Sequence, residues 1–192
     1  MRIEICGGIG SGKTTLANSL GKFGFSVANE KVDSTSFLDE FYSNPELFAF
    51  ETEISFLLQH SVGIKKLYNS HKIVCDYSFE QDFAYAINNL NEAELEMYKS
   101  VFDEIKRPLN NPDLIIRLES STETKKKRIK LRGRINEQMI DDEYIEKTDA
   151  LISNRLSNTC IPVLCIDSEK NDFREMIVTK QIVEQINKEL QM

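Results

Sequence analysis

Nine residues near the start of the chain have the types and the spacing of a phosphate-binding loop. They are Gly7, Gly8, Ile9, Gly10, Ser11, Gly12, Lys13, Thr14 and Thr15, and they fit the pattern G-x-x-x-x-G-K-[ST]. The glycines let backbone N–H groups curl inward around phosphate oxygens, and Lys13 can reach the β- and γ-phosphates. The hydroxyl of Thr14 can bind Mg²⁺. The motif therefore predicts that the chain binds a nucleoside triphosphate.

The segments on either side of this loop are those that the motif requires. The apolar run Ile3-Glu4-Ile5-Cys6 predicts a strand that leads into the loop, and Leu16-Ala17-Asn18-Ser19-Leu20 predicts a helix that leaves it. The positive end of the helix dipole then faces the bound anion. A glycine-rich turn alone is a weak signal, because glycine often marks only a tight turn. Here strand, motif and helix coincide, which favours the phosphate-binding interpretation.

Two carboxylates follow further predicted strands. Glu30 comes after the apolar segment 25–29, and Asp76 ends the segment 72–76. Ligands of parallel α/β sheets lie at the carboxyl ends of the strands, so both side chains are candidates for chemistry. We expect Asp76 to complete the Mg²⁺ environment that Thr14 begins, and Glu30 to take a proton from an attacking hydroxyl. The alternative for each is a solvated loop residue or a helix cap.

A basic run follows the fourth predicted strand, from Lys125 to Arg134. It could be a solvated helix face, a nucleic-acid patch or a lid over the triphosphate. The net charge of −7, from 24 basic and 31 acidic residues, argues against a general polyanion-binding surface. A lid at about 125–138 is favoured, because Gly133 allows a sharp bend at the end of a helix. We expect Arg128, Arg132 and Arg134 to neutralise charge on the transferred phosphoryl group.

Predicted strands and helices alternate along the chain. Short apolar segments predict strands at 2–6, 25–29, 72–76, 113–118 and 162–167. Longer segments predict helices at 13–22, 46–69, 79–89, 92–107, 121–132, 142–156 and 172–190. Buried strands with helices between them imply an α/β fold with three layers and a five-stranded parallel sheet. Because 192 residues show no repeat and no linker, we expect a single domain over 1–192.

Composition points to a globular protein inside the cell. Hydrophobic residues make up 41% of the chain and charged residues 29%. No apolar run approaches the ~18 residues that cross a membrane, and the early strand leaves no room for a signal peptide. The cysteines are Cys6, Cys75, Cys160 and Cys165. We expect buried, reduced thiols without zinc-ligand spacing to His60 and His71, in a cytoplasmic enzyme that binds neither nucleic acid nor membrane.

In their order and separation these features resemble the deoxyribonucleoside kinase family, especially its bacterial deoxyadenosine and deoxyguanosine kinases. The similarity rests on the phosphate loop, Glu-x-Val after strand two, Asp-x-Ser after strand three and an Arg-x-x-x-Arg-x-Arg-x-x-Glu lid. It runs from residue 1 to about 155. The resemblance implies a P-loop kinase fold with a helical lid, ATP as phosphoryl donor, Mg²⁺, and phosphorylation of a nucleoside 5′-hydroxyl. It also implies that Glu30 is the general base and that Asp76 helps to hold magnesium.

The resemblance assigns two further residues to the sugar 3′-hydroxyl. They are Tyr42, within Phe41-Tyr42-Ser43-Asn44-Pro45, and Glu137, three residues after Arg134. Without the resemblance they would be a packing aromatic and a carboxylate at a helix start. Family members commonly pair through helices of the region 46–107, which is rich in apolar residues here. A homodimer is therefore expected, with a purely internal core as the alternative.

The chain departs from the family pattern at two positions. Tyr77 stands where the family usually has an arginine near the 5′-hydroxyl and the general base. A tyrosine cannot offset carboxylate charge, so we expect Glu30 to be more basic and less well positioned. Glu53 aligns with a base-reading glutamine of the family. An ionised glutamate only accepts hydrogen bonds, which predicts a preference for guanine, with its N1–H and N2–H₂ donors, over adenine.

Two other functions stay open on sequence alone. A nucleoside monophosphate kinase would need extra cations around its acceptor phosphate, whereas the region 30–60 is acidic. A nucleotide-binding protein with little or no catalysis could use the same fold as an interaction module. Tyr77 favours this last alternative, while Glu30 and the intact lid argue against it.

Overall fold

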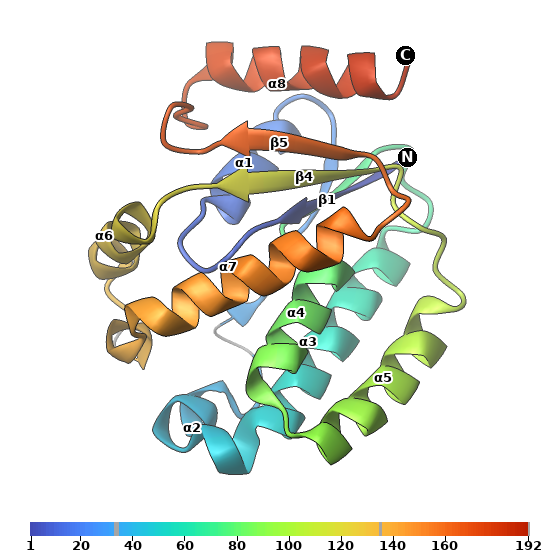
Figure 1. Cartoon of the computed structure of the whole chain (residues 1–192). Coiled ribbons are helices and arrows are strands. Elements are labelled where there is room, and N and C mark those ends of the chain that lie inside the picture. The colour runs from blue at the N-terminus through green and yellow to red at the C-terminus, as the bar shows by residue number, and fades with distance from the viewer. Residues whose placement is uncertain (33–34, 135, 192) are drawn as a thin grey trace.

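A parallel sheet forms the centre of the computed structural model, which describes residues 1–32, 35–134 and 136–191 (Figure 1). Its strands are β1 (Arg2–Cys6), β2 (Ser26–Ala28), β3 (Ile73–Cys75), β4 (Leu114–Glu119) and β5 (Val163–Asp167). They lie in the order β2-β3-β1-β4-β5, and each runs parallel to its neighbours. The predicted α/β class and five-stranded parallel sheet are confirmed.

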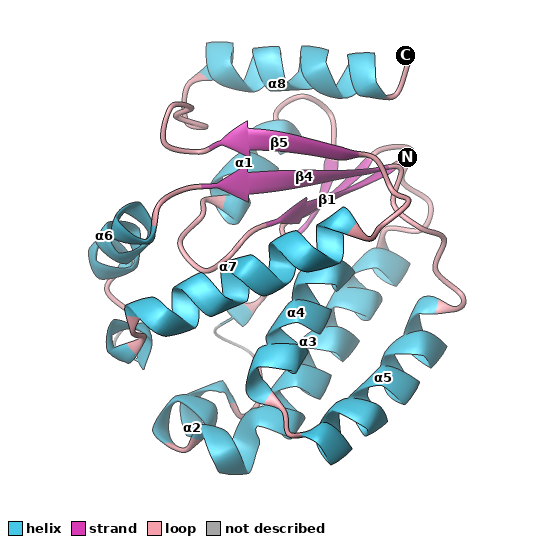
Figure 2. Cartoon of the chain, viewed as in Figure 1, coloured by secondary structure: helices cyan, strands magenta, loops and turns pink. Residues whose placement is uncertain are grey.

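Helices cover both faces of this sheet, as Figure 2 shows. On one face lie α1 (Lys13–Gly21) and α8 (Met176–Glu189). The other face carries α3 (Pro45–Lys66), α4 (Phe79–Asn89), α5 (Glu92–Lys106) and α7 (Asp142–Ser157). The expected three layers are therefore present. Among the described helices, none combines the length and the apolar character that crossing a bilayer requires.

Side chains of the central strands alternate between these two faces. Ile3 and Ile5 of β1 join the core under α1 and α8, whereas Cys6 packs with Ala84 of α4 and Ile152 of α7. Each of these five side chains is fully buried. Burial on both faces explains why the strands read in the sequence as nearly continuous apolar runs.

Two short helices were not predicted. They are α2 (Leu38–Ser43) and the 3₁₀ turn η2 (Asn136–Met139), which follows the lid helix α6 (Thr122–Arg132). Both are too short to show a helical repeat, and α2 begins after Phe37 without a side-chain cap. The last predicted helix also starts late, at Met176, because residues 172–175 form a turn. Position 135 of the predicted lid lies outside the described residues.

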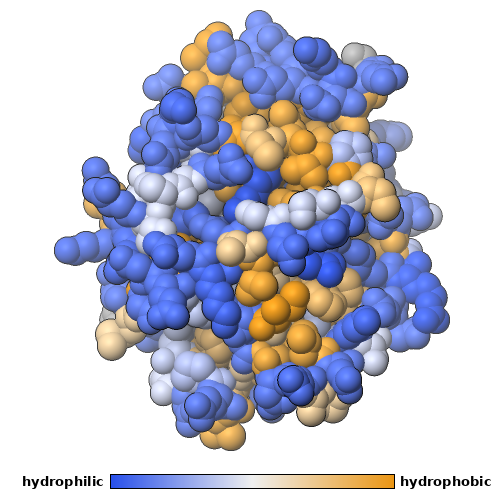
Figure 3. Space-filling view, in the orientation of Figure 1, coloured by the Kyte–Doolittle hydropathy of each residue, from blue (hydrophilic) through white to orange (hydrophobic). Residues whose placement is uncertain are grey.

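The expectation for the cysteines is only half confirmed. All four are free thiols, and Cys6 and Cys75 are buried, but Cys160 and Cys165 are exposed. Cys165 lies on β5, the strand at the edge of the sheet, and it is on the face that α7 covers. Helix α7 covers the neighbouring strands more fully than it covers β5. On the side of the molecule that Figure 3 shows, hydrophilic side chains predominate, and apolar ones reach the surface on either side of α7. An edge strand thus leaves its outward thiol open to solvent.

Candidate active site

The loop between β1 and α1 builds one end of the site. Gly10 has a φ of 76°, in the left-handed region that favours glycine, and a Cβ there would lie 2.8 Å from the carbonyl oxygen of Lys125. Lys13 Nζ donates to the carbonyl oxygen of Gly7 at 2.7 Å, so its charge lies inside the curve of the loop. The loop therefore has the backbone shape and the cation that phosphate binding requires.

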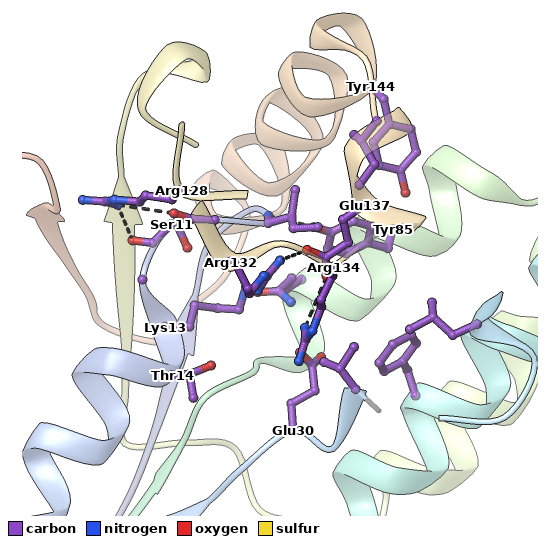
Figure 4. Close-up of a pocket in the computed structure, with 18 of the residues that line it drawn as sticks. Ser11, Lys13, Thr14, Glu30, Tyr85, Arg128, Arg132, Arg134, Glu137 and Tyr144 are labelled. Carbon is purple, nitrogen blue, oxygen red and sulfur yellow. Dashed lines mark hydrogen bonds and ion pairs between the residues drawn. The ribbon is translucent and has the colours of Figure 1, made fainter. Parts of the chain in front are cut away.

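A cavity of about 1170 Å³ opens beside this loop (Figure 4). Loop residues 9–15 line one end, and side chains from α2, α3, α4, η2 and α7 line the other. The predicted site residues that reach it besides the loop are Glu30, Tyr42, Glu53, Arg128, Arg132, Arg134 and Glu137. Asp76 and Tyr77 lie behind the wall, each only 1% exposed. The fold thus gathers residues that are far apart in the sequence.

The three lid arginines divide into two groups. Arg132 and Arg134 both pair with the buried carboxylate of Glu137, with Arg134 Nη1 at 3.2 Å from Glu137 Oε1 (Figure 4). Arg128 points the other way and donates to the carbonyl oxygens of Ser11 at 3.1 Å and Ser168 at 2.6 Å. Arg128 therefore ties α6 to the phosphate loop and to the segment after β5.

Local backbone structure places the lid over the loop. Gly133 ends α6 with a φ of 73°, which is the bend that the sequence predicted. Near the start of α6, the ammonium of Lys125 is buried and pairs with Asp149 of α7. Asp149 in turn packs against the loop, since a Cβ at Gly8 would lie 2.7 Å from its Oδ1. The lid helix is thus fixed at its base, and its arginines project from the far end.

Glu30 and Asp76 are joined where their strands end. The backbone N–H of Glu30 donates to Asp76 Oδ1 at 2.5 Å. They meet because β2 and β3 are parallel neighbours, whose carboxyl ends share one edge of the sheet. The carboxylate of Glu30 faces the cavity with 19% of the side chain exposed, whereas Asp76 is enclosed.

Asp76 and Thr14 offer the oxygen ligands that Mg²⁺ prefers. Asp76 Oδ2 is buried and has no hydrogen-bond partner among the described residues. Burial and the Glu30 carboxylate raise the pKa of Asp76 to about 6, so a cation would stabilise its charged form. In the described part of the chain no group of three or more His, Cys, Asp or Glu side chains is arranged to hold a metal ion. Two protein oxygens, completed by phosphate and water, suit Mg²⁺, and these residues therefore fit the ion.

A histidine without a predicted role contacts Glu30. His60 of α3 lies with Nε2 at 3.3 Å from Glu30 Oε1 and Nδ1 at 2.8 Å from Asp82 Oδ2. Its ring stacks on that of Tyr77, with centroids 3.8 Å apart and an angle of 5°. Burial opposes the charged form, but the carboxylates of Asp82 and Glu30 outweigh it and raise the pKa of His60 to about 10. His60 is therefore a buried cation.

The expectation of a more basic Glu30 is wrong. Burial raises its pKa, but His60 and then Lys13 outweigh burial, and the pKa of Glu30 lies below its ordinary value. Tyr77 does not face the cavity either, since its hydroxyl donates to the backbone carbonyl of His60 at 3.0 Å. The Tyr77 side chain fits because residue 63 is a glycine: a Cβ at position 63 would lie 2.5 Å from the Tyr77 hydroxyl oxygen. Tyr77 thus supports His60 from behind, where it has no contact with the cavity.

Glu53 lies in the cavity wall but is not ionised at neutral pH. Its Oε1 accepts a hydrogen bond from Asn89 Nδ2 at 2.7 Å. Burial raises the pKa of Glu53 to about 8, so the neutral acid predominates at pH 7. The predicted guanine preference assumed an ionised Glu53, and that premise is wrong. A neutral carboxylic acid both donates and accepts, as glutamine does.

Tyr42 and Glu137 come together although one belongs to α2 and the other to η2. The two elements are linked by Asn136 Nδ2, which donates to Asp39 Oδ1 at 2.5 Å. Burial and the nearby Glu137 carboxylate raise the pKa of Tyr42. The tyrosine hydroxyl is therefore a neutral donor beside a carboxylate, as the binding of a sugar hydroxyl requires.

One face of α4 contributes residues that the sequence analysis missed. Gln81 Oε1 accepts from the N–H of Gly7 at 3.1 Å, and the hydroxyl of Tyr85 accepts from the N–H of Ile9 at 3.1 Å. Asp82 also lines the cavity, and the ring of Tyr144 of α7 lies beside that of Tyr85, with centroids 6.5 Å apart. The positions 81, 82 and 85 repeat with helical spacing, which was the available signal.

Known proteins are similar to this chain in sequence and in fold. The model of the family described as "Deoxynucleoside kinase" matches residues 3–191. A deoxyguanosine kinase of Bacillus subtilis is 31% identical over 96% of this chain and 93% of its own. A deoxyguanosine kinase of Lactobacillus acidophilus is 29% identical over 94% and 86%. The solved structure of deoxyadenosine kinase from M. mycoides with bound dCTP covers 98% of this chain and 100% of its own, with a TM-score of 0.83 and 24% identity, and thus shares the fold.

Proposed function

The chain belongs to the deoxynucleoside kinase family and phosphorylates a deoxynucleoside with ATP, and we propose that Glu30 is the base of this transfer. The observation that carries the proposal is the Glu30 carboxylate, which faces the cavity between the phosphate loop and the far wall. Its pKa lies below the ordinary value, so it is an ionised acceptor. Glu30 takes the proton of the 5′-hydroxyl, the 5′-oxygen bonds to the γ-phosphorus, and the bond between that phosphorus and the β,γ-bridging oxygen breaks to release ADP.

We assign the phosphate end to the loop and the lid. The loop N–H groups and Lys13 bind the triphosphate, and Arg132 and Arg134 neutralise charge on the transferred group. The hydrogen bonds of Arg128 to the loop favour a different role for it, which is to hold the lid on the loop. Gln81 and Tyr85 support the loop from α4.

We infer that Mg²⁺ binds at Thr14 and Asp76. When bound, the ion neutralises charge on the phosphate oxygens and helps to orient them. The hydroxyl of Thr14 and the unpartnered oxygen of Asp76 would hold it at the start of α1. Asp76 has a second task in any state, since it fixes the backbone of Glu30.

The opposite end of the cavity suits a purine deoxynucleoside. Tyr42 and Glu137 are placed to bind the sugar 3′-hydroxyl. Neutral Glu53, held by Asn89, offers one donor and one acceptor, which match N1 and the 6-substituent of either adenine or guanine. The names of the relatives, deoxyguanosine kinase and deoxyadenosine kinase, agree with this proposal.

The acceptor end does not suit a nucleoside monophosphate. Its wall carries the carboxylates of Glu30, Asp82 and Glu137. The neighbouring cations His60, Arg132 and Arg134 already pair with these carboxylates. An acceptor phosphate would thus meet repulsion.

A nucleoside panel tests the proposed function. Purified protein is mixed with ATP and Mg²⁺ and with each deoxynucleoside or deoxynucleoside monophosphate, and the products are separated by anion-exchange chromatography. We expect 5′-monophosphates, formed fastest from deoxyguanosine and deoxyadenosine. Turnover confined to the monophosphates, or to pyrimidine nucleosides, would contradict it.

We also propose a homodimer that forms through α3. Leu47, Leu58 and Val62 repeat on one face of this helix and are 62%, 48% and 44% exposed. Light scattering at micromolar concentration should give twice the mass of one chain, and a monomer would contradict the proposal. The cytoplasmic location and the single domain stay predictions.

A further inference from the structure

Three ionisable side chains from three separate elements form a buried line behind the cavity. Asp82 of α4 contacts His60 of α3 at 2.8 Å, and His60 contacts Glu30, after β2, at 3.3 Å. The side chains of Asp82 and His60 are only 4% and 1% exposed. Burial of ionised groups costs free energy unless they are paired, so such a line needs a reason beyond filling space.

Packing alone does not require a histidine at position 60. The ring stacks on Tyr77 with centroids 3.8 Å apart, and its other neighbour is the ring of Phe56 at 5.8 Å. A phenyl ring could make the same stacking contacts. It could not contact two carboxylates, one on each ring nitrogen, as His60 does.

We propose that His60 is a positioning residue that acts on the catalytic base: an imidazolium, fixed by Asp82, that orients the Glu30 carboxylate toward the substrate hydroxyl. The proposal rests on the proposed role of Glu30. Asp82 fixes Nδ1, so the ring cannot turn, and Nε2 then faces Glu30 Oε1. The second carboxylate oxygen of Glu30 stays available for the 5′-hydroxyl.

The charges around His60 agree with a permanent cation. The charge of Glu30 faces it from the segment after β2 and that of Asp82 from α4, while Glu53 of α3 itself is the neutral acid. Lys13 of α1 and Arg134 of the lid act on Glu30 from the cavity side. The hydroxyl of Tyr77 donates its hydrogen bond to the backbone carbonyl of His60, so it does not contact the ring nitrogens of His60. Without the imidazolium, Glu30 and Asp82 would face each other as two uncompensated carboxylates.

Two substitutions separate the charge of His60 from its shape. His60→Phe keeps a ring on Tyr77 and removes the cation, whereas His60→Arg restores a cation that can bridge two carboxylates. We expect kcat to fall roughly 10- to 100-fold in His60→Phe, the scale on which a buried carboxylate loses its charged partner, with the KM for ATP unchanged. His60→Arg should recover a large part of that loss. His71→Phe, at an exposed histidine outside the cavity, is the control and should match the wild type.

Three outcomes would overturn the proposal. Wild-type kcat in His60→Phe would show that no cation is needed, and equal losses in His60→Phe and His60→Arg would assign His60 to packing. The third is read from the unmodified protein, so it holds even if a variant fails to fold. In ¹⁵N NMR His60 should remain an imidazolium at pH 8.5, where an ordinary histidine is neutral; a neutral ring would overturn the proposal.

Glu30→Gln distinguishes this inference from the proposed function. If Glu30→Gln abolishes turnover while His60→Phe leaves it intact, only the role of His60 fails. If Glu30→Gln keeps full turnover, the assignment of the base itself fails.

Discussion

The two ends of the cavity are built by different means. The loop at the phosphate end is one continuous segment, in which backbone N–H groups, left-handed glycines and Lys13 are all set by local geometry. The opposite end consists of single side chains from α2, α3, α4, η2 and α7, several of them buried and ionisable. A substitution at the phosphate end should therefore affect every nucleoside alike. At the opposite end, its effect should depend on the nucleoside and on pH.

The largest effect is expected at Glu30, which lies between the two ends. Glu30→Gln keeps the shape of the side chain but removes the proton acceptor, so kcat should fall roughly 10³-fold while ATP binds as before. Steady-state kinetics and calorimetric titration of ATP measure the two quantities. Weakened ATP binding would mean that Glu30 belongs to the phosphate end.

Lys13→Ala should have the next largest effect. Loss of this cation should lower kcat/KM for ATP roughly 10²-fold, because its ammonium lies inside the curve of the loop. The factor should be the same for deoxyguanosine and deoxyadenosine. If the loss of kcat/KM differed between the two nucleosides, the two ends of the cavity would not act independently. Lys65→Ala, at an exposed lysine of α3, is the control.

Tyr42→Phe tests the sugar site. Loss of the hydroxyl should reduce kcat/KM for deoxynucleosides about tenfold, the scale of one hydrogen bond. A 2′,3′-dideoxynucleoside lacks the 3′-hydroxyl and should be used equally well by the variant and the wild type. An equal loss with both kinds of substrate would show that Tyr42 only supports the cavity wall.

The smallest expected effect is a change of base preference with pH. Because the pKa of Glu53 is raised to about 8, this acid is neutral below that pH and ionised above it. The ionised form repels the N1 lone pair of adenine and accepts from the N1–H of guanine. Between pH 6.5 and 9 the ratio of kcat/KM for deoxyguanosine to that for deoxyadenosine should rise by up to about tenfold. In Glu53→Gln the ratio should stay constant, and a constant ratio in the wild type would contradict the assignment.

The same contrast explains what could be predicted from the sequence. The loop, the strand Arg2–Cys6 and the helix Phe79–Asn89 lie where they were predicted, because glycine spacing and apolar periodicity are local signals. The lid bend at Gly133 was predicted for the same reason. The short helix α2 gave no such signal, and neither did the 3₁₀ turn that carries Glu137.

Charge compensation could not be read locally. Tyr77 stands where the family pattern has a positive charge. The cation that compensates the Glu30 carboxylate lies elsewhere, at His60 of α3. One clue was present: His60 comes seven residues after Glu53, which places both on the same face of α3. Only the packing of α3 against α4 shows that Asp82 is the second partner of His60. Protonation states depend on such contacts, so the assumption of an ionised Glu53 failed for the same reason.

Gly63 restricts the order in which this site can change over evolution. A tyrosine at position 77 and any side chain at position 63 compete for one space, since the Cβ would lie 2.5 Å from the hydroxyl oxygen. A lineage that acquires Tyr77 must therefore first accept glycine within a helix, which costs about 1 kcal/mol relative to alanine. Once Tyr77 is in place, return to alanine at position 63 is blocked. The two positions are thus coupled through packing, and the stacked support of His60 depends on both.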